Sequence, residues 1–168
     1  MAKTSDIPLS TFDAASAAVD LGSQKLTNVA DPTSDQDGAT KKYVDDAILL
    51  DEALQFVIDG GGSAISTGVK GDLEVPFDGT ISQVTLLADQ SGSIQVDIWK
   101  DTYANFPPVD ADSITASAEP AISSADKNQD STLSGWTTAL SAGDILRFNV
   151  DSATTIQRVT VSLRVART

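Results

Sequence analysis

The side chains that could carry chemistry in this sequence are mostly carboxylates. The 168 residues hold 24 aspartates and glutamates but no histidine and no cysteine. The side chain best suited to proton transfer near neutral pH is therefore absent, and so are Ser-His-Asp and Cys-His arrangements. Two carboxylates could still hydrolyse a glycosidic bond. Pairs such as Asp97 with Asp101, or Asp110 with Asp112, are expected by chance in so acidic a chain, so we predict structural roles for them and no enzyme activity. The alternative is a carboxylate-based polysaccharide hydrolase.

Oxygen ligands for a metal ion are also present in the sequence. Asp110, Asp112 and Asp126 would suit calcium better than zinc, but no segment has the ladder of Asp and Asn with a central glycine and a terminal Glu. No Lys-Ser or Lys-Thr pair follows Gly60-Gly61-Gly62 at a helix start, which favours a flexible turn over a phosphate-binding loop. The sequence therefore predicts neither a metal site nor a cofactor.

An aromatic stretch is the sharpest candidate for a binding site. Trp99 shares its strand parity with Gln95 and Asp97, so its indole is expected on the polar side of the strand. Flat rings beside carboxylates and amides suit a glycan-binding surface, because the rings stack on the apolar faces of sugars. The alternative is that Trp99 packs in a subunit interface or under the following loop. That loop adds three further candidates, namely Tyr103, Asn105 and Phe106.

A narrow apolar stripe, called the seam below, is expected on a helix that precedes the β-rich part of the chain. The spacing between seam residues alternates between three and four, as in a coiled coil. Such a stripe is too narrow to cover a domain but wide enough to meet its own copies, and the adjoining Val44 and Ile48 broaden it. We therefore predict a homotrimer. Asp35 or Asp37 is the expected N-cap of the helix. The seam residues are Thr40, Tyr43, Ala47, Leu50, Leu54 and Val57.

From about residue 58 onward, apolar residues recur at every second position. Some seven or eight short runs of this kind are separated by turn signals, and no helical pattern lies between them. This arrangement predicts a mainly β fold, an antiparallel β-sandwich or jelly roll, with Trp136 in its core. The expected core runs include Leu73–Phe77, Ile94–Ile98, Leu146–Val150 and Val159–Val165.

Composition excludes some classes of partner. The formal net charge of −13 argues against nucleic acid, whose phosphates would be repelled. No run approaches the roughly 18 apolar residues that a membrane helix needs. The first residues also lack the apolar core of a signal peptide. We therefore expect neither membrane insertion nor signal-directed secretion.

Two stretches of the sequence resemble a known module. The runs Leu21–Pro32, LGSQKLTNVADP, and Asp37–Asp45, DGATKKYVD, resemble a short module of bacteriophage tail fibres. Ser23 and Gly38 depart from that module, which usually has glycine and alanine at these positions. Such modules occur in homotrimeric fibres and link a virion-binding end to a distal domain. The β region is also similar to distal fibre domains, chiefly through DIWKDTYANFPP and WTTALSAGDILRFNV.

The resemblance implies a location on the virion and a division of the chain into three parts. Residues 1–20 would attach to the tail or baseplate, residues 21–57 would form the strand, turn and helix of a trimerisation module, and residues 58–168 would form the β-sandwich. The expected partners are two further copies of the chain, another virion protein and a host-surface polysaccharide. The alternative within the virion is a capsid decoration or head-fibre protein that binds no receptor.

Overall fold

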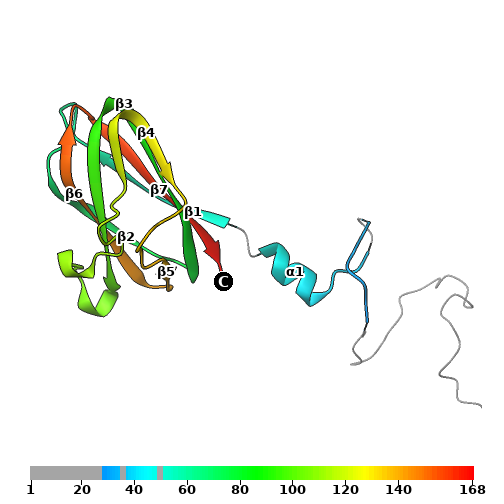
Figure 1. Ribbon diagram of the computed structural model, residues 1–168. Helices are drawn as coiled ribbons and strands as arrows, with labels where there is room; N and C mark the ends of the chain where they lie inside the picture. Colours follow the sequence, from blue (N-terminus) through cyan, green and yellow to red (C-terminus); the bar gives the residue numbers. More distant parts are fainter. Residues whose placement is uncertain (1–27, 35–36, 49–50) are drawn as a thin grey trace, which may run out of the picture. The chain divides into compact units, whose positions relative to one another are not determined.

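The computed structural model describes residues 28–34, 37–48 and 51–168 of the chain (Figure 1). The chain divides into two compact units, Met1–Val44 and Asp45–Thr168. The predicted attachment segment, residues 1–20, lies outside the described residues. The elements in chain order are helix α1 (Lys41–Ile48), strands β1 (Asp51–Asp59), β2 (Gly68–Glu74) and β3 (Gly79–Thr102), the 3-10 turns η3 (Tyr103–Asn105) and η4 (Asp110–Asp112), and strands β4 (Ala121–Asp130), β5 (Ala139–Leu140), β6 (Asp144–Thr154) and β7 (Arg158–Arg167).

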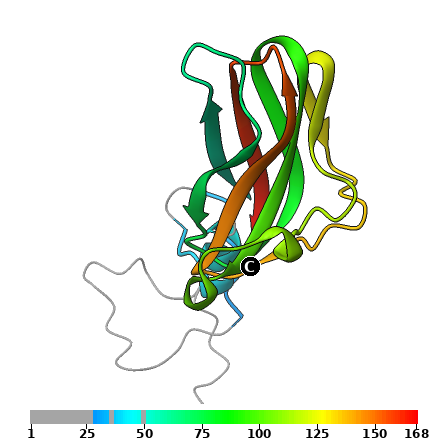
Figure 2. The ribbon, with the colours of Figure 1, turned by 90° about the vertical axis from the view of Figure 1, so that its left-hand side faces the viewer.

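The strands form one curled antiparallel sheet in the order β1-β7-β3-β6-β2. Strand β3 makes the curl possible because it takes part in both halves of the sheet. Its first part, from Gly79 to Ala88, pairs with β7, and its last part, from Ser93 to Thr102, pairs with β6. Strand β4 follows the other edge of both parts of β3. Figure 2 shows β3 bending over at one end of the domain, so that the two halves of the sheet face each other. The prediction of a mainly β, antiparallel fold is confirmed.

The core lies between the two halves of the curled sheet. Alternation explains it directly, because every second residue of a strand points to the same face. The four expected apolar positions of β7 are buried, as are the expected sets of β3 and β6. Trp136 is partly buried against this core, and its Nε1 donates to the carbonyl oxygen of Ala118 at 2.8 Å. The alternating core residues are Ile94, Val96, Ile98, Leu146, Phe148, Val150, Val159, Val161, Leu163 and Val165.

The structure corrects the predicted seam. Helix α1 ends at Ile48, and the chain is already in β1 at Asp51. Leu54 is buried in the β core, whereas Val57 points outward and is 54% exposed. The helical spacing misled because Leu54 and Val57, three residues apart, are both apolar but lie on opposite faces of strand β1. The predicted domain boundary after residue 57 consequently falls inside β1. Leu50 lies outside the described residues, and so does the side chain of Ala47.

The start of helix α1 also differs from the expected one. Thr40 is the N-cap, because its Oγ1 accepts a hydrogen bond from the amide of Tyr43 at 3.0 Å. Its hydroxyl also donates to Asp31 at 3.0 Å. Asp37 instead closes the preceding turn, since its carboxylate accepts from the amides of Thr33 and Ser34. These hydrogen bonds lower the pKa of Asp37, the bond from Thr33 most of all.

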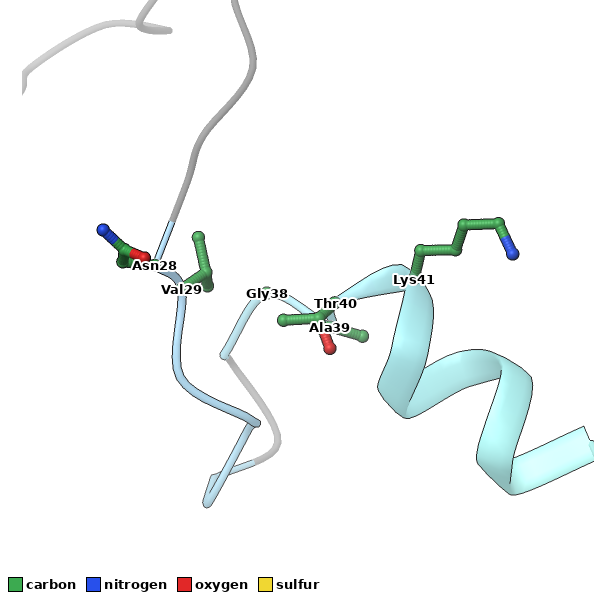
Figure 3. A pocket seen from close by; sticks show the side chains of 6 residues that line it. All are labelled: Asn28, Val29, Gly38, Ala39, Thr40 and Lys41. Atoms are coloured by element: carbon green, nitrogen blue, oxygen red, sulfur yellow. The ribbon is translucent and has the colours of Figure 1, made fainter.

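A hollow lies between residues 28–29 and the segment 38–41 at the start of the helix (Figure 3). Asn28 and Lys41 extend away from each other in the close view, and the rest of the lining is small or aliphatic. The Thr40 hydroxyl in the lining is already bonded to Asp31. The hollow therefore offers few free polar groups to a ligand.

Candidate functional site

The aromatic stretch belongs to a long loop between β3 and β4. The loop contains the turns η3 and η4, which extend beyond the strand ends in Figure 1. It lies at the end of the β domain where β1 begins. Asp51, the first residue of β1, and Thr80, near the start of β3, share the partner Ala166, so these two strands begin side by side. Because β3 bends back on itself, its last residue, Thr102, returns to the same end of the domain, where it pairs with Asp144. The chain therefore enters the β domain at the end that carries the aromatic loop.

A buried carboxylate anchors this loop to the sheet. Asp97 in β3 is only 4% exposed, and its Oδ1 accepts hydrogen bonds from the hydroxyls of Ser113 and Thr115 at 2.7 and 2.6 Å. Its Oδ2 accepts from Trp99 Nε1 at 2.6 Å. Burial of a carboxylate is unfavourable unless it is well hydrogen-bonded, so these contacts hold both the loop and the indole. Trp99 is also joined to Ser113 by an isolated β-bridge.

Trp99 is therefore placed under the loop, which is the alternative that the sequence left open. Its indole is half-buried, and its single N–H donor is already used by Asp97. The ring does project from the polar side of the strand, as its parity with Asp97 predicted. Its direct role is to support the loop, and this leaves the outer part of the loop as the surface that a ligand could reach.

The tip of the loop exposes two aromatic rings. Tyr103 is 79% exposed and Phe106 is 50% exposed. Asn105, the third loop candidate, donates from its amide to Asp101 Oδ1 at 3.1 Å, and the amide of Thr102 donates to the same oxygen at 2.7 Å. These bonds, the Asn105 bond first, lower the pKa of Asp101 below its usual range. The tip thus presents flat apolar surface beside a carboxylate that is ionised at neutral pH.

An arginine from β6 supports the tip from below. The guanidinium of Arg147 forms two hydrogen bonds to the Asp72 carboxylate, at 2.6 and 3.0 Å, and the pairing raises the pKa of Arg147. Its Cζ lies 5.2 Å from the centre of the Phe106 ring, over its face. It also donates to the Pro108 carbonyl at 3.4 Å. Sequence reasoning missed this arginine, although its position opposite the core set of β6 placed it on the same outer face as Trp99.

The four glycan candidates are therefore neighbours, with different exposure. Tyr103, Asn105 and Phe106 lie within one turn of chain at the loop tip, and Trp99 lies at its base. The structure adds an exposed valine, Val109, farther along the same loop. The arrangement can offer stacking surface with fixed geometry, because the base of the loop is hydrogen-bonded to the sheet.

A second group of carboxylates lies near the far end of β6. Glu119 and Asp151 are within hydrogen-bonding reach of each other, and Gln95 donates to Glu119 while Asn149 donates to Asp151. Burial raises the pKa of Glu119, and the negative charge of Asp151 raises it further.

The carboxylates singled out from the sequence serve the loop as well. Asp112 accepts from the amide of Val109 at 2.8 Å, while Asp97 and Asp101 bind the partners described above. Within the described residues no group of three acidic side chains is placed to hold a metal ion. No helix in the described part of the chain is long and apolar enough to cross a membrane. No protein-family model matches this chain, and no curated protein matches it significantly.

Proposed function

We propose that this chain is a structural protein of a bacteriophage tail fibre, a homotrimer whose β domain binds a host-surface glycan. The single observation that carries the binding role is the loop tip, where Tyr103 and Phe106 expose their rings although neither is needed to close the core. Exposed aromatic side chains on a fixed support mark binding surfaces more often than chance exposure does. The virion setting is supported by the resemblance of residues 21–45 to the fibre module.

The charge around the tip favours a neutral sugar. Asp101 is held ionised, and the guanidinium of Arg147 is neutralised by Asp72. An anionic polysaccharide would meet uncompensated repulsion here, whereas a neutral hexose could stack on the rings and hydrogen-bond to the carboxylate. We therefore propose neutral glycans as the ligand class and predict weaker binding of acidic ones.

Trimerisation would allow three weak glycan-binding sites to hold the fibre on a cell surface. A single exposed aromatic tip offers little contact area, but three tips held together gain from effective concentration. In the proposed trimer, helix α1 contributes Tyr43 and the adjoining Val44, both of which are exposed. Leu54 leaves the predicted seam because it belongs to the β core. Residues 1–20 are proposed to attach to the tail or baseplate.

The experiment is a binding titration of the purified full chain against immobilised bacterial surface polysaccharides, neutral and acidic, at fixed ionic strength. Replacing Tyr103 and Phe106 together with alanine should weaken binding to the neutral polysaccharides by about tenfold or more. The matched control is Val69→Ala, which removes a similarly exposed apolar side chain from β2.

Each outcome of the titration separates one function from another. Binding that is lost in the double variant and retained in the control supports the fibre proposal. Intact trimers that bind no polysaccharide would favour the decoration protein instead. Shortened polysaccharide chains after incubation would favour the hydrolase.

A further inference from the structure

The outer face of the sheet half formed by β1, β7, β3 and β4 differs in chemistry from the rest of the domain. Its central positions are set by the strand register, which aligns three rows of outward side chains across the strands. We call these rows the flat face. The first row is Val57, Thr160, Leu87 and Lys127, the second is Gln55, Ser162, Thr85 and Gln129, and the third is Ala53, Arg164 and Gln83.

The flat face contains no acidic side chain in these three rows. It carries two cations, Arg164 and Lys127, in a chain whose formal net charge is −13. Acidic residues flank the rows, with Asp51 and Glu52 at one end and Asp59 and Asp89 at the other. The opposite sheet half has acidic residues on its outer side at Asp72, Asp101 and Asp151, besides Asp97, which the aromatic loop covers. The depletion is therefore a property of one face.

The flat face also exposes aliphatic side chains in line with each other. Val57 is 54% exposed and Leu87 is 51% exposed, and both pair with Thr160, which lies between them. The second row consists of amide and hydroxyl side chains. Gln55 donates to Ser162 at 3.4 Å, and Gln129 donates to Thr85 at 3.0 Å. An aliphatic row beside uncharged polar groups is the composition of a protein interface with few charges to desolvate.

We propose that the flat face is the surface through which the β domains of two copies of this chain contact each other. The inference rests on the proposed homotrimer and names where its β domains meet. A second copy is the occupant that the charge pattern favours. Chains of net charge −13 repel each other least where acids are absent, and the two cations of one copy can lie near the acids that flank the face of the next.

The proposed trimer would place the flat faces of three copies around a common axis. The outer side of the other sheet half, with Asp72, Asp101 and Asp151, would then face away from that axis. The aromatic loop lies over that other half, since its anchor Asp97 pairs with Asn149 of β6. A contact through the flat face therefore leaves the proposed glycan surface open in every copy.

The test uses the full chain and two kinds of variant. Leu87→Lys together with Val57→Lys adds two cations to the aliphatic row, and the concentration at which trimers dissociate, measured by analytical ultracentrifugation, should rise by about tenfold or more. The matched control is Val69→Lys, because Val69 is 47% exposed on β2, away from the flat face. Circular dichroism checks that all three proteins fold alike.

A proximity measurement keeps the test independent of stability. The chain has no cysteine, so Leu87→Cys and Val69→Cys each carry one thiol. A short bis-maleimide should cross-link chains of Leu87→Cys within the assembled protein and should not cross-link those of Val69→Cys.

The results distinguish this inference from the proposed function. If the wild-type chain sediments as a single copy at every concentration, both the trimer and the flat-face contact are refuted. If it is a trimer but the Leu87 and Val57 changes leave the dissociation unaltered and no cross-link forms at position 87, only the flat-face contact is refuted.

Discussion

The ring of Phe56 in β1 stacks on the ring of Phe148 in β6, with the ring centres 4.4 Å apart and the planes within 3° of parallel. The two strands belong to opposite halves of the curled sheet, so this pair joins the halves across the core. Phe148 is fully buried and Phe56 is partly so. We expect Phe148→Ala to lower the free energy of unfolding by about 3–5 kcal/mol, through lost burial and the cavity left behind.

Chemical denaturation followed by tryptophan fluorescence measures this loss. Phe106→Ala is the matched control, because that ring is half exposed at the loop tip and its removal should change the free energy of unfolding by less than about 1 kcal/mol. Equal losses in the two variants would mean that the stacked pair does not hold the sheet halves together.

The Phe56 ring also explains a glycine in β2. Gly71 lies at a bulge in the pairing of β2 with β6, and a Cβ built there would lie 2.8 Å from Cζ of Phe56. Its φ of +157° is one that L side chains rarely adopt. We predict that Gly71→Ala lowers the free energy of unfolding by about 1–3 kcal/mol.

A second substitution, Phe56→Leu, tests whether the clash with the ring is the cause. Combining Gly71→Ala with Phe56→Leu should destabilise by less than the sum of the two single changes, because the smaller side chain makes room for the methyl group. Strict additivity in urea unfolding would show that backbone strain alone, and not contact with the ring, requires glycine.

Leu54 tests the corrected boundary between helix and sheet. As a seam residue its replacement by alanine would weaken the trimer and leave the β domain intact. As a buried residue of β1 it should lower the free energy of unfolding by about 2–4 kcal/mol. Thermal unfolding at several protein concentrations separates the two, since a loss confined to subunit contacts depends on concentration. A purely concentration-dependent effect would restore Leu54 to the seam.

Period-two alternation predicted most of the β domain, because every second residue of a strand faces the core and must be apolar. The sets in β6 and β7 are buried as expected. The helix end was mistaken because Leu54 and Val57 fit a heptad spacing but lie in strand β1, with Leu54 inward and Val57 outward. The spacing of apolar residues cannot distinguish a helix from a strand here, whereas the pairing of this segment with β7 identifies it as a strand.

The sequence indicated which residues of the aromatic loop lie together, but not how the loop is held to the sheet. Tyr103, Asn105 and Phe106 were found because aromatic and amide groups cluster in sequence. The support under them depends on partners far along the chain, Asp72 with Arg147 and Asp97 with Thr115, which come together only through the sheet. Sequence proximity carries no information about such pairs.

Asp97 is predicted to control the order of the aromatic loop. Thr115→Val removes one hydroxyl donor without changing side-chain volume and should cost about 1–2 kcal/mol of stability. Asp97→Ala leaves several donors buried without an acceptor and should cost on the order of 3 kcal/mol. Hydrogen exchange at residues 103–115 should speed up in both variants. Thr67→Val, at an exposed position, is the control, and unchanged exchange in the loop would contradict the anchoring role.

Glu119 should make the β domain more stable at low pH than at high pH. Its pKa is raised, first by burial and then by the charge of Asp151, so the folded protein holds this proton more tightly than the unfolded chain does. The folded state is therefore favoured at low pH by this group. That advantage is lost as the pH rises from the ordinary glutamate value, near 4.5, through the raised pKa of the folded state.

Glu119→Gln removes the ionisation and retains a side-chain oxygen that can accept the hydrogen bond from Gln95. It should stabilise the protein at pH values above the raised pKa of Glu119, where the wild-type carboxylate is charged beside Asp151, and should have little effect below the ordinary pKa of glutamate. The difference between the variant and the wild type in free energy of unfolding, measured by urea denaturation at a series of pH values, should grow with pH through this window. Glu74→Gln, exposed in β2, serves as the control for loss of one negative charge. A constant difference across the series would show that the proximity of Glu119 and Asp151 does not affect stability.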